Sequence, residues 1–186
     1  SAKKFIDKGY TSIGKMTDLA GTKVITICVD DVYKVVEDLK SSFNCNSEHD
    51  DYIKSPKFGY QSYHLGVNYK GLNIECQVKT YEMDKAQDII HDRIYKNPSI
   101  SREIKEYSMP KFFSLLNPIP YEQQSKIEKV IAPLIKKLEH NNDLNDVDSI
   151  IEKIYGAAAN ELKKEMMMIE NQRSLLVKKI NEVYKE

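Results

Sequence analysis

The sequence lacks an excess of charge of one sign, a long apolar run and an apolar leader. Its 28 Lys and Arg residues balance 28 Asp and Glu residues, which argues against a broadly basic protein that binds nucleic acid over its whole surface. No apolar run approaches the roughly 18 residues of a membrane-spanning helix. The first residues, Ser1–Lys4, lack the apolar core of a signal peptide. These absences predict a cytoplasmic protein with no membrane span.

Cysteine is also scarce. Cys28, Cys45 and Cys76 are odd in number and fall in or near predicted strands, which favours reduced thiols in or near the core over a disulfide framework. No Cys-x-x-Cys or Cys–His spacing accompanies them, so we expect no metal site built on cysteine.

The first half of the chain alternates strand and helix patterns. The run 22–29 is rich in Val, Ile and Thr, and Lys70-Gly71 marks a tight turn between two further strands. Predicted helices cover 1–9, 30–41 and 84–95, and predicted strands cover 22–29, 47–53, 61–69 and 72–81. This order predicts a mixed sheet flanked by helices, in an α/β or α+β class.

The second half shows only helical patterns and suits a helical extension of a single domain. We expect breaks at Pro110 and at 117–120. The predicted helices cover 100–107, 112–116, 121–140 and 147–184. Met166, Met167 and Met168 in the last helix are interpreted as gap-filling or oligomer contacts, not as metal ligands.

Polar side chains recur on one face of the predicted strand 72–81. Because alternate residues of a strand share a face, Glu75, Gln77 and Lys79 point one way, and the apolar residues between them point the other. On the preceding strand, the turn could bring His64 onto the same polar face. A simple solvated face remains an alternative explanation.

Asp18 and Glu75 are candidate ligands for a divalent metal. Mg²⁺ is commonly bound by one or two carboxylates, with substrate phosphates completing its shell, and such an ion offsets charge in phosphoryl transfer. Asp18 alone would also suit a helix cap. Lys54, Lys57 and Lys79 add positive charge for phosphate, and Tyr60, after Gly59, could present its ring to a base or simply lie half-buried in a loop.

Several short motifs occur in a fixed order. They are Asp18-Leu19-Ala20-Gly21, Asp51-Tyr52-Ile53 with Pro56-Lys57, Gly59-Tyr60-Gln61-Ser62-x-His64, Glu75-x-Gln77-x-Lys79-Thr80, and His91-Asp92-x-x-Tyr95-Lys96. Together they resemble the RelA/SpoT synthetase domain, in the form of a small alarmone synthetase. The resemblance covers about residues 1–96 and leaves 97–186 as a helical extension for oligomerisation or for packing against the domain.

The resemblance implies an α+β, nucleotidyltransferase-like fold and a Mg²⁺-dependent transfer of pyrophosphate from ATP to the ribose 3′-hydroxyl of GDP or GTP. It implies catalytic and metal-binding roles for Asp18 and Glu75, and a homo-oligomer. The remaining implied positions contact the acceptor nucleotide: Tyr60 on guanine, and Lys54, Lys57, His64, Gln77 and Lys79 on phosphates or ribose. Because His91-Asp92 is a single pair, we expect no separate hydrolase site.

The sequence also departs from the family pattern. An Arg-x-Lys-Ser segment that binds ATP phosphates usually precedes the first helix, whereas the printed sequence begins Ser1-Ala2-Lys3-Lys4. Lys23 and Lys79 stand where Arg is common, which keeps the charge but loses the bidentate fork. An Arg-x-Lys upstream of Ser1 would complete the ATP site.

Two alternatives stay open. A toxin-like relative would use an adenine nucleotide or the tRNA 3′ end as acceptor, the one case in which nucleic acid is a partner. A catalytically impaired relative would bind nucleotides without turnover.

Overall fold

The computed structural model describes residues 20–183, with the side chains of residues 46–48 left aside. Asp18 and the helix predicted for residues 1–9 lie outside this range. The described chain packs as two units. The sheet unit comprises residues 20–88 and 112–118, and the helical unit comprises 89–111 and 119–183. The predicted boundary after residue 96 stays a prediction.

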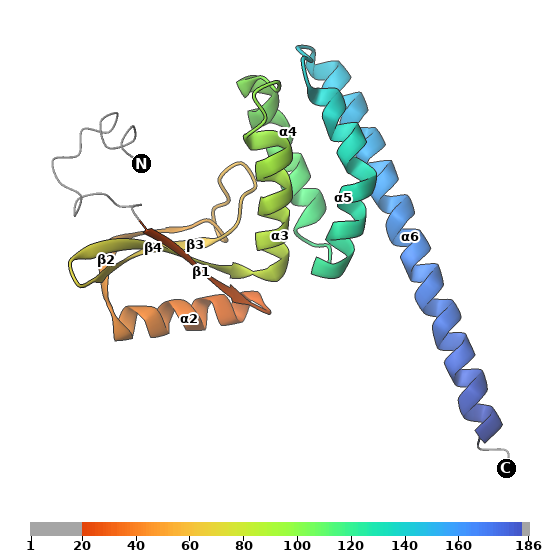
Figure 1. Cartoon of the computed structure of the whole chain (residues 1–186), viewed down its shortest axis with the longest axis horizontal. Coiled ribbons are helices and arrows are strands. Elements are labelled where there is room, and N and C mark those ends of the chain that lie inside the picture. The colour runs from red at the N-terminus through yellow and green to blue at the C-terminus, as the bar shows by residue number, and fades with distance from the viewer. Residues whose placement is uncertain (1–19, 184–186) are drawn as a thin grey trace. The chain divides into compact units, whose positions relative to one another are not determined.

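The sheet unit is built on a four-stranded mixed sheet (Figure 1). Its strands are β1 (Ala20–Thr26), β2 (Asn44–Asp51), β3 (Tyr63–Tyr69) and β4 (Leu72–Thr80), in the spatial order β1-β4-β3-β2. β1 runs parallel to β4, and the other pairs are antiparallel. The predicted mixed sheet and its flanking helices are confirmed.

Helix α2 (Val29–Ser42) covers one face of this sheet (Figure 1). Its buried Val32 and Val36 join a core of inward-facing strand residues: Tyr63, Leu65, Val67, Cys76 and Val78. Val29, predicted as the end of a strand, begins this helix instead. Asp30 and Asp31 occupy the first turn, where negative charge favours a helix N-terminus.

The opposite face of the sheet is polar, as strand parity predicts. Lys23, Gln77, His64 and Asp50 form one cross-strand row from β1 to β2. Directly paired residues share a face, so this row lies on the side away from α2. The same face carries Glu75 and Lys79, because they alternate with the core residues Cys76 and Val78.

Helix α3 (Tyr81–Ile90) follows β4 without a loop. The Thr80 hydroxyl accepts a hydrogen bond of 3.3 Å from the backbone N–H of Met83, which satisfies one of the free donors of the first turn. The helix therefore begins three residues earlier than predicted. It continues into the π-helix η2 (His91–Tyr95).

Helix α4 (Arg102–Leu116) corrects the prediction of a break at Pro110, which lies inside it. A proline removes one hydrogen bond from a helix interior. Burial of Phe112, Phe113 and Leu116 in the next turn offsets that cost. The other predicted break, at 117–120, does separate α4 from α5.

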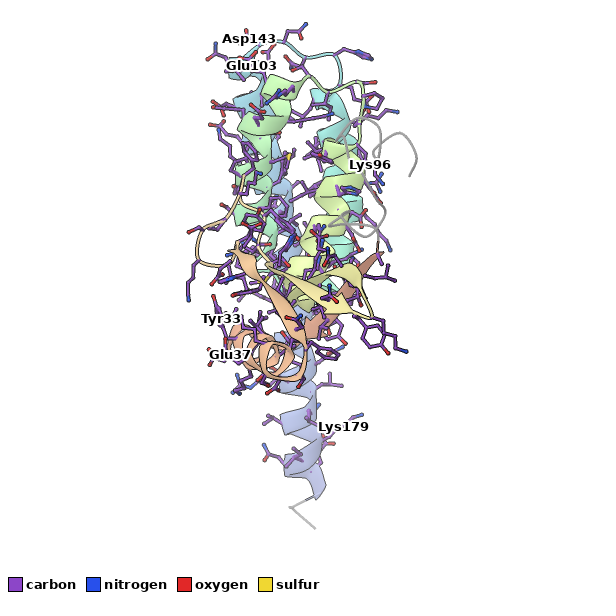
Figure 2. All side chains as sticks on the ribbon, turned by 90° about the vertical axis from the view of Figure 1, so that its left-hand side faces the viewer. Tyr33, Glu37, Lys96, Glu103, Asp143 and Lys179 are labelled. Carbon is purple, nitrogen blue, oxygen red and sulfur yellow. The ribbon has the colours of Figure 1, made fainter. Side chains whose placement is uncertain are left out.

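The helical unit also contains α5 (Tyr121–Ile135), the 3₁₀ helix η3 (Lys136–Leu138) and α6 (Leu144–Val183). Lys126 of α5 pairs with Glu165 of α6 at 2.7 Å. Beyond that pair α6 extends past the end of α5, as the position of Lys179 shows in Figure 2. Across the described residues, no helix combines the length and apolar character needed to cross a membrane.

All three cysteines are free thiols. Cys76 is buried in the sheet core and Cys45 is half-buried, but Cys28 is exposed. The prediction of a core or near-core position is therefore wrong for Cys28, because β1 ends at Thr26 and leaves Cys28 in the short connection before α2.

Candidate functional site

Glu75 is the centre of a hydrogen-bonded group on the polar face of β4. The Gln77 amide nitrogen donates to Glu75 Oε2 at 3.3 Å, and His64 Nδ1 lies 3.4 Å from Glu75 Oε1. The predicted common face of His64 and Glu75 is confirmed by this contact. The Glu75 side chain stays 37% exposed, so its carboxylate is held from two sides and remains accessible.

The Tyr60 hydroxyl lies 2.8 Å from His64 Nε2 and 3.5 Å from Gln77 Oε1. Burial raises the pKa of Tyr60 to about 12, and burial also lowers the pKa of His64, against the opposing effect of Glu75. A neutral Tyr60 donates to Nε2 of a neutral imidazole, which places the imidazole hydrogen on Nδ1, facing Glu75. The result is a chain of contacts from Tyr60 through His64 to the carboxylate.

Lys79, also on β4, extends this hydrogen-bonded group through Gln77. Its side chain is fully buried, and its ammonium donates to Gln77 Oε1 at 3.2 Å. The same group pairs with Asp84 Oδ1 at 2.9 Å and donates to Gln87 Oε1. Burial lowers the pKa of Lys79, and the hydrogen bond to Asp84 raises it again.

The loop before β3 fixes the Tyr60 ring. Phe58 and Gly59 both have positive φ, at 52° and 83°, and this sharp turn is closed by a 3.0 Å bond from the Tyr60 N–H to the Lys57 carbonyl. Asn117, just after α4, donates to Gln61 Oε1 at 2.8 Å. The ring itself lies 6.1 Å from that of Phe113 and 5.8 Å from that of Tyr52.

Glycines flank Glu75 on both neighbouring strands. Gly21 of β1 and Gly66 of β3 are its direct cross-strand partners. A Cβ added at Gly21 would have no heavy atom within 4 Å. Among the described residues, the space at Gly21, next to Glu75, is therefore open.

The other predicted site residues, Lys54, Lys57 and Asp18, are not shown to contact Glu75 among the described residues. Lys54 lies over the ring of Tyr33 at 4.8 Å and pairs with Asp51 at 3.5 Å. Tyr33 lies on α2 and packs against the sheet core, so this conformation does not bring Lys54 to Glu75. Lys57 is exposed and pairs with Tyr60 through the backbone, and Asp18 lies outside the described residues.

Sequence reasoning missed three residues of this arrangement: Asp84, Gln87 and Asn117. Asp84 also pairs with Lys23 of β1 at 2.8 Å, and the pKa of Asp84 is lowered by its hydrogen bonds to Lys23 and Lys79, against its burial. A signal was present, because Asp84 and Gln87 are polar at i and i+3 on a helix that otherwise buries apolar residues.

Within residues 20–183, no three His, Cys, Asp or Glu side chains come together in a group able to hold a metal ion. Of the predicted metal-binding pair, Asp18 and Glu75, only Glu75 lies among the described residues. β1 begins at Ala20, opposite Ile74, and Asp18 precedes it by two positions in the sequence. The carboxylate oxygens of this pair are ligands that suit Mg²⁺.

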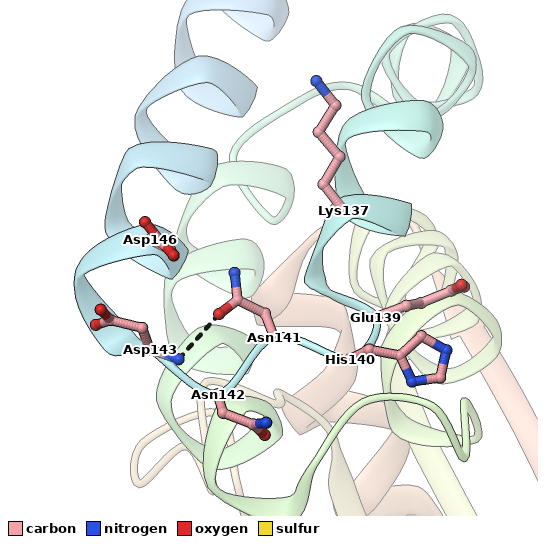
Figure 3. A pocket seen from close by; sticks show the side chains of 7 residues that line it. All are labelled: Lys137, Glu139, His140, Asn141, Asn142, Asp143 and Asp146. Atoms are coloured by element: carbon pink, nitrogen blue, oxygen red, sulfur yellow. Dashed lines mark hydrogen bonds between the residues drawn. The ribbon is translucent and has the colours of Figure 1, made fainter.

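The helical unit carries a separate surface pocket where η3 leads into α6 (Figure 3). His140 and Asn141 line it, and Asn141 Oδ1 accepts a 2.9 Å hydrogen bond from the N–H of Asp143. This contact organises the turn before α6. The lining residues do not include any of the predicted site residues.

Comparison with known proteins gives matches in sequence and in structure. Residues 1–100 match the family described as "Region found in RelA / SpoT proteins". Two proteins, each named a probable guanosine-3′,5′-bis(diphosphate) 3′-pyrophosphohydrolase, match over 75 residues, which is 39% of this chain. The Mycoplasma genitalium protein is 40% identical and the Mycoplasma pneumoniae protein 39%. The matched part is 10% of each relative, so the chain spans about a tenth of their length.

Two solved structures share the fold over most of the chain. The small alarmone synthetase 1 from Bacillus subtilis, bound to its product pppGpp, is 28% identical with a TM-score of 0.54, covering 70% of this chain and 73% of that one. A GTP pyrophosphokinase family protein from Streptococcus pneumoniae is 27% identical with a TM-score of 0.50, covering 68% and 70%. The predicted α+β fold agrees with these structures.

Proposed function

Because this chain belongs to the RelA/SpoT family, we propose that it transfers pyrophosphate from ATP to the ribose 3′-hydroxyl of GDP or GTP. The 3′ oxygen attacks the β-phosphorus of ATP, the bond between the β-phosphorus and the bridging oxygen to the α-phosphorus breaks, and AMP leaves. Support comes from the polar sheet face around Glu75 and from the likeness to a synthetase that was solved with pppGpp.

The observation that carries this proposal is the arrangement of the Glu75 carboxylate. It is accessible, it lies between two glycines, and it is held by Gln77 and His64. A carboxylate held in one place can accept the proton of the attacking hydroxyl as a general base, a role typically worth 10²–10⁴-fold in rate. Rigid support also keeps the carboxylate from turning away from the hydroxyl.

Mg²⁺ is the proposed cofactor. Asp18 and Glu75 would hold it, together with phosphate oxygens of ATP. When bound, the ion would neutralise charge that develops on the transferred phosphoryl groups. The chain's own residues then bind and orient the acceptor.

Tyr60 is the proposed contact for the guanine base. Its ring contacts Phe113 on one edge, and the loop geometry fixes its direction. Lys57 would bring positive charge toward the acceptor phosphates. Lys79 is fully buried and its three donors are occupied, so it would act on the acceptor through Gln77. Since Lys54 is paired with Asp51, it would serve only after leaving that partner.

The proposed assembly is a homo-oligomer formed through α6. Four exposed apolar side chains of α6 after Glu165 lie at spacings of three, seven and four residues: Met166, Ile169, Leu176 and Ile180. This spacing is typical of a helix that packs on another helix. A second copy of the chain offers the same apolar stripe.

The test is product formation by the full-length gene product. The protein is incubated with ATP, Mg²⁺ and either GDP or GTP, and anion-exchange chromatography separates the nucleotides. We expect AMP and a 3′-pyrophosphorylated guanine nucleotide in equal amounts. If product forms only with an adenine nucleotide or tRNA, that molecule is the acceptor in place of GDP or GTP. If guanine nucleotide binds without turnover, the protein is a nucleotide-binding protein and not an enzyme.

A further inference from the structure

We propose that Asp84 is a positioning residue: through Lys79 it fixes the direction of the Gln77 amide, and so holds the Glu75 carboxylate in place. This inference deepens the proposed function and rests on it. It assigns a role to a residue on α3 that touches neither Glu75 nor a substrate.

Lys79 has a complete set of hydrogen-bond acceptors. An ammonium group carries three N–H donors and no acceptor. Asp84, Gln77 and Gln87 provide three oxygens for these donors. Because the Lys79 side chain is fully buried, water does not replace a lost partner without a change in the surrounding structure.

The ammonium in turn decides which way the Gln77 amide points. Since Lys79 can only donate, Gln77 must present its oxygen to Lys79. The amide nitrogen then faces the other way and donates to Glu75 Oε2 at 3.3 Å. If the amide turned over, its oxygen would face the carboxylate oxygen, and the two would repel.

Asp84 keeps Lys79 charged. Burial lowers the pKa of Lys79, and the hydrogen bond and charge of Asp84 oppose that change. The other groups that act on Lys79 are Lys23 on β1, which disfavours its charge, and Asp88 on α3, which favours it, with the ring of Tyr60 at 5.9 Å. Without Asp84, a neutral amine with a lone pair could accept a hydrogen bond, and the amide would lose its fixed direction.

Asp88 offers a matched control on the same helix. It contacts Lys23 at 3.7 Å, and its side chain is 58% exposed. Exposed ion pairs contribute little. Asp88→Asn therefore removes one carboxylate from α3 while leaving the three acceptors of Lys79 in place.

The experiment compares Asp84→Asn, Asp84→Glu and Asp88→Asn with the wild type in the full-length protein. We expect Asp84→Asn to lower kcat by about 10²-fold, the cost of a misplacement of about 1 Å in a reacting group, with KM for the acceptor changed far less. In Asp84→Asn, activity on the alkaline side should be lost at a lower pH than in the wild type, because Lys79 then loses its proton at a lower pH. Asp84→Glu should restore much of kcat, and Asp88→Asn should match the wild type.

A readout that needs no turnover separates this inference from the proposed function. Side-chain NMR follows the Gln77 NH₂ signals, assigned with Gln77→Ala, and the Lys79 Nζ titration. We expect both to change in Asp84→Asn and to change far less in Asp88→Asn, because Asp88 acts on Lys79 by its charge alone and not by a hydrogen bond. Unmoved Gln77 signals and an unmoved Lys79 titration in Asp84→Asn would overturn the inference, whereas an inactive wild type with the expected NMR changes would overturn only the proposed function.

Discussion

Gly21→Ala should separate folding from catalysis at the Glu75 site. Gly21 is the direct partner of Glu75 across β1 and β4, and an added methyl would meet nothing within 4 Å. Replacing glycine by alanine without strain stabilises a protein by about 0.4–1 kcal/mol, because it restricts the unfolded chain. For a chain of this size, that corresponds to a rise in Tm of about 1–4 °C.

Activity should move in the opposite direction. The methyl group would occupy the space beside the carboxylate, and a displacement of the acceptor hydroxyl by about 1 Å costs about 10²-fold in rate. We therefore expect kcat/KM to fall by about two orders of magnitude, measured by AMP release, while the thermal unfolding curve moves slightly upward.

Gly156→Ala is the matched control. Gly156 lies exposed on α6, and its added Cβ also meets nothing within 4 Å. The substitution should stabilise the helix by about 1 kcal/mol and leave kcat/KM unchanged. A folded Gly21→Ala protein with wild-type kcat/KM would refute the claim that the acceptor uses the space beside Glu75.

Three further predictions concern other parts of the chain. Asn117→Ala should loosen the loop that carries Tyr60 and raise KM for the acceptor about fivefold, as expected for the loss of a bond worth about 1 kcal/mol, with KM for ATP unchanged in steady-state assays. An alkaline absorbance titration, taken as wild type minus Tyr60→Phe, should show one phenol ionising near pH 12. Because the unfolded phenol ionises near 10, stability from Tyr60 should be present below pH 10 and be lost as pH rises toward 12; ionisation near 10 would contradict its burial. Leu176→Glu with Ile180→Glu on the exposed stripe of α6 should reduce the molar mass in light scattering, and an unchanged mass would argue against assembly through this face.

The sequence could predict the polar face of the sheet because strand geometry is periodic. Side chains alternate between the two faces along β3 and β4, and the turn between these strands sets their register. In this register His64 and Glu75 lie on the same face, 3.4 Å apart. The open space beside Glu75 depends on which strand lies next to β4. That pairing of β1 with β4 joins distant parts of the chain, so local patterns do not contain it.

The features that local patterns do not contain depend on tertiary contacts. The loop around Lys54 contains no signal that its ammonium would lie over Tyr33 on the other side of the sheet. Pro110 is a strong local signal for a break, yet the burial of Phe112 and Phe113 keeps α4 continuous. Asp84 looked like a helix-start residue, and its role became visible only when α3 placed it between Lys23 and Lys79.

The most direct test of the proposed pyrophosphate transfer is the movement of labelled phosphate with the wild type and with Glu75→Gln. Both full-length proteins are incubated with ATP labelled at the γ-phosphate, Mg²⁺ and GDP, and the label in the guanine nucleotide is followed with time. We predict transfer by the wild type and a rate at least about 10²-fold lower in Glu75→Gln, because the neutral amide cannot accept the hydroxyl proton. Equal rates in the two proteins, or no label in the guanine nucleotide with the wild type, would contradict this prediction.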